Sequence, residues 1–199
     1  GDMALMLDHI DPYYFLIGLG AFMLAQLCYC IAFAHNVADV GGGQGVFMNA
    51  LLATYPRLRG VVFDLAQAIE ASPARIQPEV CARCAVVVGN FLEPLPPMGD
   101  IYVLQRVLHD WDDETAIRVL RNCRNAMKAG QTLLIIERVL PPLIPAGEAA
   151  LSDVLMLVMN GGRERTGADF HRLLEASGFR MERTIPTRSI LSIVEGSVV

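Results

Sequence analysis

The sequence contains no dense cluster of lysine and arginine. Of its 199 residues, 16 are lysine or arginine and 21 are aspartate or glutamate, which gives a formal net charge of -5 at pH 7. A protein that binds nucleic acid or anionic lipid electrostatically concentrates positive charge on one face. The composition therefore predicts no nucleic-acid partner.

Cysteine lacks the density of a disulfide scaffold. The five cysteines are an odd number and are scattered along the chain, which is typical of a reducing compartment and predicts a cytoplasmic location. Cys81 and Cys84 have the spacing of half a zinc site, but no second Cys-x-x-Cys or His-x-x-x-His pair completes it. We therefore expect no metal.

One long run has no charge at all. The residues from Tyr13 to Ala34 are uncharged, and the run is as long as a helix needs to be to cross a bilayer, about 20 residues. The residues before it are acidic, whereas the leading region of a secretory signal peptide is basic. A membrane span and a buried core helix both fit the run. Because apolar residues would surround the helix on all sides, we expect membrane association or a homo-oligomer that buries it.

From residue 36 onward, short apolar runs alternate with helical patterns. This alternation predicts an α/β fold, a mostly parallel sheet with crossover helices. The candidate strands are Val37–Val40, Gly60–Phe63, Ala85–Val88, Ile101–Leu104 and Thr132–Ile136.

The helical segments carry start and stop signals. Residues 112–130 begin with two aspartates, continue with apolar residues at helical spacing and end in glycine. Leu151–Met159 predicts a further helix, and Thr166 with Asp169 forms a capping box for the next. The tail around Pro186 predicts two short strands that pair as a hairpin at the sheet edge.

A glycine-rich turn follows the first candidate strand. Its glycines are Gly41, Gly42, Gly43 and Gly45. Glycine lets the backbone approach a ligand where a Cβ would collide. Asp64 ends the next candidate strand at about the usual interval of 20 residues, where a carboxylate can accept hydrogen bonds from two ribose hydroxyls. Together these features predict a nucleoside cofactor.

Two features of the turn narrow the choice of cofactor. No Lys-Ser or Lys-Thr follows the glycines, so the turn is not a phosphate-binding P-loop. The dinucleotide pattern G-x-G-x-x-G is also absent. Instead Asp39 precedes a compact G-G-G-x-G, which suits a cofactor with a charged amino-acid tail and no pyrophosphate. These features favour S-adenosylmethionine.

From about Val37 to Val194 the chain resembles the class I O-methyltransferases of the caffeate, hydroxyindole and bacterial small-molecule type. The matching stretches are "DVGGGQG", "VVFDL", "GNFLEPLP", "RVLHDWDDE", "LLIIERVLP" and "GGRERTGADFHRLLEASGF". The resemblance implies a Rossmann-like methyltransferase fold with an antiparallel C-terminal strand over residues 36–199. It also implies methyl transfer from S-adenosylmethionine to a small hydroxylated acceptor of secondary metabolism, expected to be a phenol. This resemblance also leads us to expect that residues 36–199 lack the family's usual N-terminal dimerisation domain.

The same resemblance assigns contacts with the cofactor, beside those expected of Asp39 and the glycines. Asp64 and Leu65 would hold the ribose and the adenine, and Asn90 and Phe91 would flank the adenine. The family commonly has Asp where this chain has Asn90; because an Asn carbonyl still accepts a hydrogen bond, binding should weaken rather than vanish. Gln105 stands where many members have Lys, within the same predicted cofactor site.

The resemblance makes His109 the general base. A phenol with a pKa near 10 is mostly un-ionised at neutral pH, and a histidine with a pKa near 6.5 can remove its proton. Glu137 and Glu164 would flank this histidine, orient the imidazole and stabilise its cationic form. The resemblance also assigns four residues to the acceptor pocket: Asp110, Trp111, Met156 and Met159. Core packing would explain the two methionines equally well.

Residues 1–35 resemble a different family, a fragment of the lysoplasmalogenase-like (YhhN-like) membrane proteins, in "FLIGLGAFMLAQLCY". Two alternatives to an active methyltransferase therefore stay open. One is a non-catalytic cofactor-binding or scaffold module. The other is a membrane-associated hydrolase relic, which would explain only those first residues.

Overall fold

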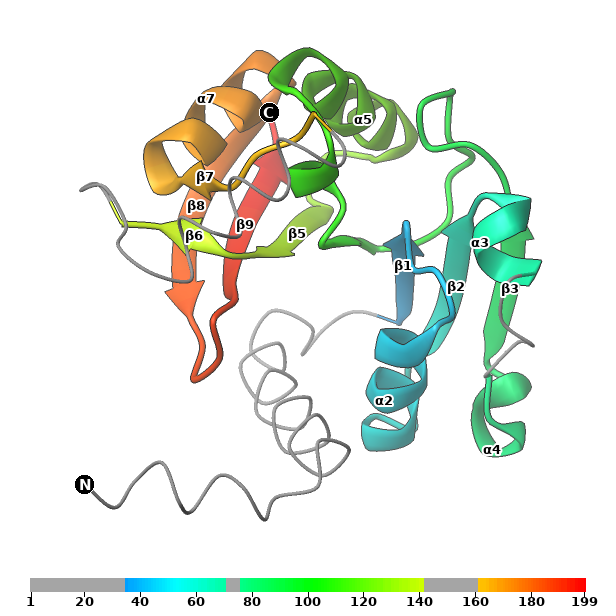
Figure 1. Cartoon of the computed structure of the whole chain (residues 1–199). Coiled ribbons are helices and arrows are strands. Elements are labelled where there is room, and N and C mark those ends of the chain that lie inside the picture. Colours follow the sequence, from blue (N-terminus) through cyan, green and yellow to red (C-terminus); the bar gives the residue numbers. More distant parts are fainter. Residues whose placement is uncertain (1–34, 71–75, 142–160) are drawn as a thin grey trace, which may run out of the picture.

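The computed structural model describes residues 35–70, 76–141 and 161–199 (Figure 1). Within these residues, seven strands form one sheet in the order β3-β2-β1-β4-β5-β9-β8. The parallel strands are β1 (Asn36–Val40), β2 (Arg59–Asp64), β3 (Cys84–Val88), β4 (Ile101–Gln105) and β5 (Thr132–Glu137). The antiparallel strands are β8 (Phe179–Pro186) and β9 (Ser192–Val198). The predicted α/β fold and its five parallel strands are confirmed.

The remaining described elements are short strands and helices that connect the sheet. The helices are α2 (Val46–Thr54), α3 (Ala66–Glu70), α4 (Pro78–Cys81), the 3-10 turn η1 (Leu108–Asp110), α5 (Asp113–Ala126) and α7 (Gly167–Ala176). Two short strands, β6 (Val139–Leu140) and β7 (Arg165–Thr166), pair in parallel beside the main sheet.

The sheet separates two apolar cores. Alternate residues of a strand point to opposite faces, and in β5 the side chains of Leu133 and Ile135 join the core under α5 and α7, whereas Leu134 and Ile136 join the core under α2 and α4. All four are fully buried. A strand that is covered on both faces reads as a continuous apolar run, as "TLLIIE" does.

Both predicted helix starts are confirmed by their caps. The Asp112 side chain accepts a hydrogen bond from the backbone N–H of Thr115 at the start of α5. At the start of α7, Thr166 and Asp169 form the reciprocal capping box. These two helices lie side by side on one face of the sheet (Figure 1). They fix the position of the segment between β4 and α5.

The predicted C-terminal hairpin is present, but only one of its strands lies at the edge. Strand β9 pairs with β5 on one side and with β8 on the other, so β8 is the edge strand and Pro186 ends it. Proline is tolerated there because an edge strand has unpaired backbone donors on its outer side.

Two of the predictions fall on residues that the structure does not describe: the apolar run from Tyr13 to Ala34 and the helix Leu151–Met159. In the part of the chain that is described, no helix is both long enough and apolar enough to cross a membrane. Nor do any three His, Cys, Asp or Glu side chains in that part gather into a possible metal site.

Candidate active site

The carboxyl ends of four parallel strands bring the predicted site residues to one edge of the sheet. Asp64, Gln105 and Glu137 are the last residues of β2, β4 and β5, and Asp39 is the penultimate residue of β1. The strand order reverses direction between β1 and β4. In open α/β sheets, ligands bind outside the carboxyl ends of the strands at such a switch point.

The Asp39 carboxylate is buried without a partner. Its residue is 1% exposed, and no described residue donates a hydrogen bond to either of its oxygens. Burial, with the nearby charge of Asp64, raises the pKa of Asp39 from 3.8 to about 7. A buried carboxylate without donors is costly, so this position suits a ligand that brings a cation or N–H groups.

The glycine-rich turn packs tightly around this carboxylate. Gly41, Gly43 and Gly45 have φ values of 75°, 52° and 70°, the left-handed region that glycine adopts most readily. A Cβ on Gly42 would lie 2.5 Å from Oδ2 of Asp39. The turn therefore needs its glycines for its backbone shape and for the close approach to Asp39.

Asp64 closes the turn from the neighbouring strand. Its Oδ2 accepts a hydrogen bond from the Gly43 N–H at 2.7 Å, and its Oδ1 accepts one from the Leu65 N–H at 2.7 Å. An ionised carboxylate has about four lone-pair sites, so Asp64 keeps capacity for ribose hydroxyls. The Leu65 side chain, 37% exposed, offers an apolar surface beside it.

Asn90 and Phe91 follow β3 in a compact turn. Asn90 Oδ1 accepts a hydrogen bond from the Leu92 N–H at 2.9 Å, which occupies one of its two lone pairs. The Phe91 ring meets Trp111 edge to face, with ring centroids 6.2 Å apart. Phe91, predicted for the adenine site, therefore contacts Trp111, predicted for the acceptor pocket.

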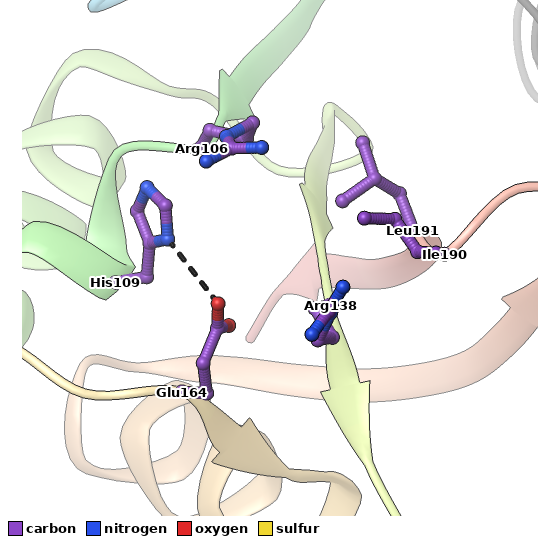
Figure 2. Close-up of a pocket in the computed structure, with 6 residues that line it drawn as sticks. All are labelled: Arg106, His109, Arg138, Glu164, Ile190 and Leu191. Atoms are coloured by element: carbon purple, nitrogen blue, oxygen red, sulfur yellow. Dashed lines mark ion pairs between the residues drawn. The ribbon is translucent and has the colours of Figure 1, made fainter. Parts of the chain in front are cut away.

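His109 lies in η1 and is 5% exposed. Its Nδ1 is 3.7 Å from Oε1 of Glu164 (Figure 2). Its Nε2 is 3.6 Å from Oδ1 of Asp110. Burial alone would lower the pKa of His109, but the interaction with Glu164 and the charges of Glu137 and Asp110 outweigh it and raise this pKa. The structure brings these predicted residues together around one imidazole.

Glu137 contacts the backbone that carries His109. Its Oε1 accepts hydrogen bonds from the N–H groups of Val107, Leu108 and His109 at 3.1, 2.6 and 3.2 Å. The resemblance predicted that this carboxylate flanks His109 and orients the imidazole; in the structure its hydrogen bonds go to the backbone that carries His109, and its charge raises the pKa of the imidazole. Burial raises the pKa of Glu137 to about 7, although the charge of His109 and the backbone donors oppose the rise.

Arg165 is a functional candidate that the sequence analysis missed. It is fully buried and donates to the carbonyl oxygens of Leu108 and Trp111 at 2.6 and 2.8 Å, one on each side of His109. It also donates to Oδ1 of Asp113 at 2.9 Å. The stretch "GGRERT" could have indicated a buried arginine near the site. Its spacing alone does not show whether Arg163 or Arg165 is the buried one.

Gly162, in the same stretch, permits the close approach of this loop to His109. A Cβ added there would collide with the His109 carbonyl oxygen and with the Asp110 backbone. Gly162 thus explains why "GGRERT" lies directly against η1.

A pocket of about 70 Å³ opens beside the imidazole. Ligand pockets usually measure about 300–1,000 Å³, so this pocket is smaller than a usual ligand site. Met156 and Met159, predicted for that site, lie outside the described residues. The pocket is lined by Arg106, His109, Arg138, Glu164, Ile190 and Leu191.

Comparison with known proteins identifies the family. The model of the O-methyltransferase domain family matches residues 23–180. The chain is 44% identical over 161 residues to a phenazine O-methyltransferase of Lysobacter antibioticus, a match that covers 80% of this chain and 47% of the relative. None of the comparisons supports the assignment of residues 1–35 to a membrane-protein family. The O-methyltransferase match begins at residue 23, inside this segment.

Solved structures give the same result. The mitomycin 7-O-methyltransferase superposes with a TM-score of 0.84 at 35% identity, covering 92% of this chain and 54% of that one. An O-methyltransferase from neocarzinostatin biosynthesis, solved with S-adenosylmethionine and 2-hydroxy-5-methyl naphthoic acid, superposes with a TM-score of 0.75 at 34% identity, covering 92% and 58%.

The chain spans about half the length of the curated relatives it matches. Its family match includes the glycine-rich turn, the η1 segment with His109 and the loop with Glu164 and Arg165. The protein therefore belongs to the O-methyltransferase domain family.

Proposed function

We propose that residues 36–199 form the catalytic domain of an S-adenosylmethionine-dependent O-methyltransferase that methylates a phenolic hydroxyl of a small molecule. The observation that carries this proposal is the arrangement at one sheet edge: an unpartnered buried carboxylate beside a glycine-rich turn, and a buried histidine faced by a carboxylate. The solved relative that holds S-adenosylmethionine and a hydroxynaphthoic acid supports it.

The residues at the glycine-rich end fit this cofactor. The unpartnered oxygens of Asp39 suit an ammonium group, the glycines leave room for an amino-acid tail, and Asp64 has lone pairs for ribose hydroxyls. When bound, S-adenosylmethionine supplies a methyl group on a positively charged sulfur. The fit rests on the side chains of Asp39 and Asp64 and on the glycine backbone that lies between them.

The residues at the other end fit proton removal. His109 in its neutral form can accept the proton of the acceptor hydroxyl. The hydroxyl oxygen would then take the methyl group that the cofactor supplies, with S-adenosylhomocysteine as the leaving group. Glu164, 3.7 Å away, stabilises the imidazolium that results. Glu137 and Arg165 act through the backbone: they fix the N–H and C=O groups on both sides of His109 and thereby its position.

The small size of the pocket beside His109 favours one second candidate, a module that binds the cofactor without transferring its methyl group. The pocket beside His109 is smaller than a whole acceptor site. Binding alone would require only Asp39, the glycines and Asp64. The two candidates differ in turnover and not in cofactor affinity.

The test combines calorimetry with a transfer assay. We expect S-adenosylmethionine to bind the protein, and labelled cofactor to methylate members of a panel of small phenols. His109→Gln should lower the transfer rate by about 10²-fold or more, the usual contribution of a positioned base, and leave the cofactor Kd unchanged. His171→Gln is the matched control, because His171 lies on the exposed surface of α7.

The outcomes separate the alternatives. Binding without transfer to any acceptor would support the second candidate. Absence of binding would contradict both. A His109→Gln enzyme as fast as the wild type would remove the histidine from the mechanism.

A further inference from the structure

The carboxyl end of β3 lies where the base of a bound nucleoside would sit. The sheet order β3-β2-β1 places Asp39 near the end of β1, Asp64 at the end of β2 and Asn90 just beyond the end of β3. With the amino-acid tail at Asp39 and the ribose at Asp64, the base extends toward β3, on the far side of the ribose. The Gly89 N–H donates to the Asp64 carbonyl at 2.9 Å, which joins the two strand ends.

Residues 89–93, which follow β3, form what we call the adenine turn, and two local hydrogen bonds shape it. Asn90 Oδ1 accepts from the Leu92 N–H at 2.9 Å, and the Asn90 carbonyl accepts from the Glu93 N–H at 3.0 Å. Because these partners are close neighbours in sequence, the two bonds fix the form of the turn and not its place against the rest of the fold. A contact from another element is needed for that.

Asn122 of α5 supplies such a contact. Its Nδ2 donates to the Phe91 carbonyl at 3.0 Å, across a separation of 31 residues in the chain. Phe91 is 7% exposed, and its ring belongs to the core under α5 and α7. The hydrogen bond and the packing therefore hold both the backbone and the ring of Phe91 against the helix layer.

The position of Asn122 within α5 favours a specific role for its amide. The helix buries a stripe that includes Val119, Cys123 and Ala126, and Asn122 lies half-buried beside this stripe. Asparagine has a lower helix propensity than leucine or alanine, because its side chain competes for backbone hydrogen bonds. A residue that is unfavourable for the helix itself thus donates to the adenine turn.

The same helix contacts the His109 segment at its first residue. Oδ1 of Asp113 accepts from Arg165, whose guanidinium also holds the carbonyls on both sides of His109. One helix therefore carries a contact to the adenine turn and a contact to the segment with the candidate general base. Since a helix is rigid over this length, α5 fixes the two parts of the site relative to each other.

We propose that Asn122 is a positioning residue for the cofactor: its amide places the adenine turn so that the Asn90 side chain accepts a hydrogen bond from the 6-amino group of adenine. Asn122 acts through the Phe91 carbonyl and not by touching the cofactor. The inference rests on the proposed function, because it takes the cofactor to be S-adenosylmethionine.

The test compares the Kd of two ligands by calorimetry. The ligands are S-adenosylhomocysteine and S-inosylhomocysteine, which carries an oxygen in place of the 6-amino group. We expect the wild type to prefer S-adenosylhomocysteine. Asn122→Leu, which cannot donate, should reduce that preference about three- to tenfold, the usual contribution of a hydrogen bond. The matched control is Asn125→Leu, at an exposed position of the same helix, which should change neither Kd.

Two further variants separate positioning from general structure. Asn122→Gln keeps the amide donor, so it should bind S-adenosylhomocysteine more tightly than Asn122→Leu does. Thermal unfolding of each ligand-free variant checks that it folds; Asn122→Ala, which also lacks the donor and has the best helix propensity, replaces the leucine variant if that variant does not fold.

A double-mutant cycle tests the route through the turn. Asn90→Ala should itself lose the preference for S-adenosylhomocysteine. Adding Asn122→Leu to it should reduce the preference no further, because the two residues act on one contact. Additive losses would show that Asn122 does not act through the adenine turn.

The outcomes distinguish the inference from the proposed function. An equal loss of affinity for both ligands in Asn122→Leu would overturn the inference, because a merely structural role has this effect. An unchanged preference in Asn122→Leu, or a wild type without any preference, would also overturn it and would leave the function standing. Failure of the wild type to bind S-adenosylhomocysteine would contradict the proposed function and the inference with it.

Discussion

The glycine-rich end and the His109 end of the site differ in how their buried polar groups are satisfied. At the glycine-rich end, neither oxygen of Asp39 has a described donor. At the His109 end, Oε1 of Glu137 accepts three backbone hydrogen bonds while its Oε2 has no described donor, and Arg165 donates to the carbonyls on both sides of the histidine. The Asp39 carboxylate is therefore left wholly for a ligand, whereas the protein itself holds the segment around His109 through backbone contacts.

The two ends are nevertheless in direct contact. A Cβ on Gly41 would lie 2.6 Å from Cγ2 of Val107. The Val107 N–H in turn donates to Glu137. The glycine-rich turn therefore packs against the segment that carries His109.

The largest effect is expected from removing the buried guanidinium of Arg165 at the His109 end. Arg165→Met should lower the free energy of unfolding by about 2–5 kcal/mol, because each buried carbonyl left without a donor costs about 1–3 kcal/mol. Urea denaturation measures this loss. The control Arg118→Met, at an exposed position of α5, should change stability by no more than about 0.5 kcal/mol. Equal losses for the two variants would show that the buried arginine does not hold the loop.

The second prediction concerns the glycine-rich end, where substitution should raise the stability of the folded protein instead of lowering it. Asp39→Asn should weaken S-adenosylmethionine binding about 10–100-fold, because a hydrogen bond to a charged group contributes about 1.5–3 kcal/mol. Without ligand, the same variant should be more stable than the wild type at pH 8. Calorimetry and thermal unfolding measure the two effects.

The sign of the stability change follows from the pKa of Asp39, which is raised from 3.8 to about 7. Between these values the folded protein keeps a proton that the unfolded chain has released, so the wild type loses stability as the pH rises through this window. Asparagine has no charge to bury. The gain should therefore be several degrees in Tm at pH 8, at about 2–4 °C per kcal/mol, and should vanish near pH 4. A variant less stable at pH 8 would contradict the account of Asp39 as an unsatisfied charge.

The third prediction concerns the pH dependence of the transfer rate, which reports the pKa of His109. At saturating cofactor, the transfer rate should rise with pH as the imidazole loses its proton, with a midpoint above the ordinary histidine pKa of 6.5, because Glu164 and the other carboxylates raise this pKa. Glu164→Gln removes one negative charge, so its midpoint should move to lower pH. An unshifted profile would show that the two side chains are not coupled.

The smallest effect is expected at the adenine position. Asn90→Asp should leave cofactor affinity equal or a few-fold tighter, because a carboxylate accepts more strongly from an amino group and can still accept from the Leu92 N–H. Calorimetric titration of the variant beside the wild type tests this. A marked loss of affinity would mean that the Asn90 amide donates a bond that a carboxylate cannot supply.

Local patterns predicted the secondary structure well and the site in part. Asp112, Thr166 and Asp169 identified the helix starts because a cap is a contact within four residues. The turn after β1 was identified for the same reason, since its glycines and Asp39 are neighbours in sequence. The partners of Glu137 lie about 30 residues away in the chain, so the motif predicted a place in the site for this residue but not which groups it contacts.

The alternation of strands and helices, the caps and the residue types at the strand ends could all be predicted from sequence, because each depends on propensity, periodicity or nearest neighbours. Three contacts required the folded chain: Glu137 accepts from backbone N–H groups, Arg165 is the fully buried arginine of "GGRERT", and Arg106 and Arg138 share a pocket with His109. The physical reason is that parallel strands far apart in the chain end at one edge of the sheet. Burial there, and the number of donors within reach, determine which charged groups are satisfied and which are left for a ligand.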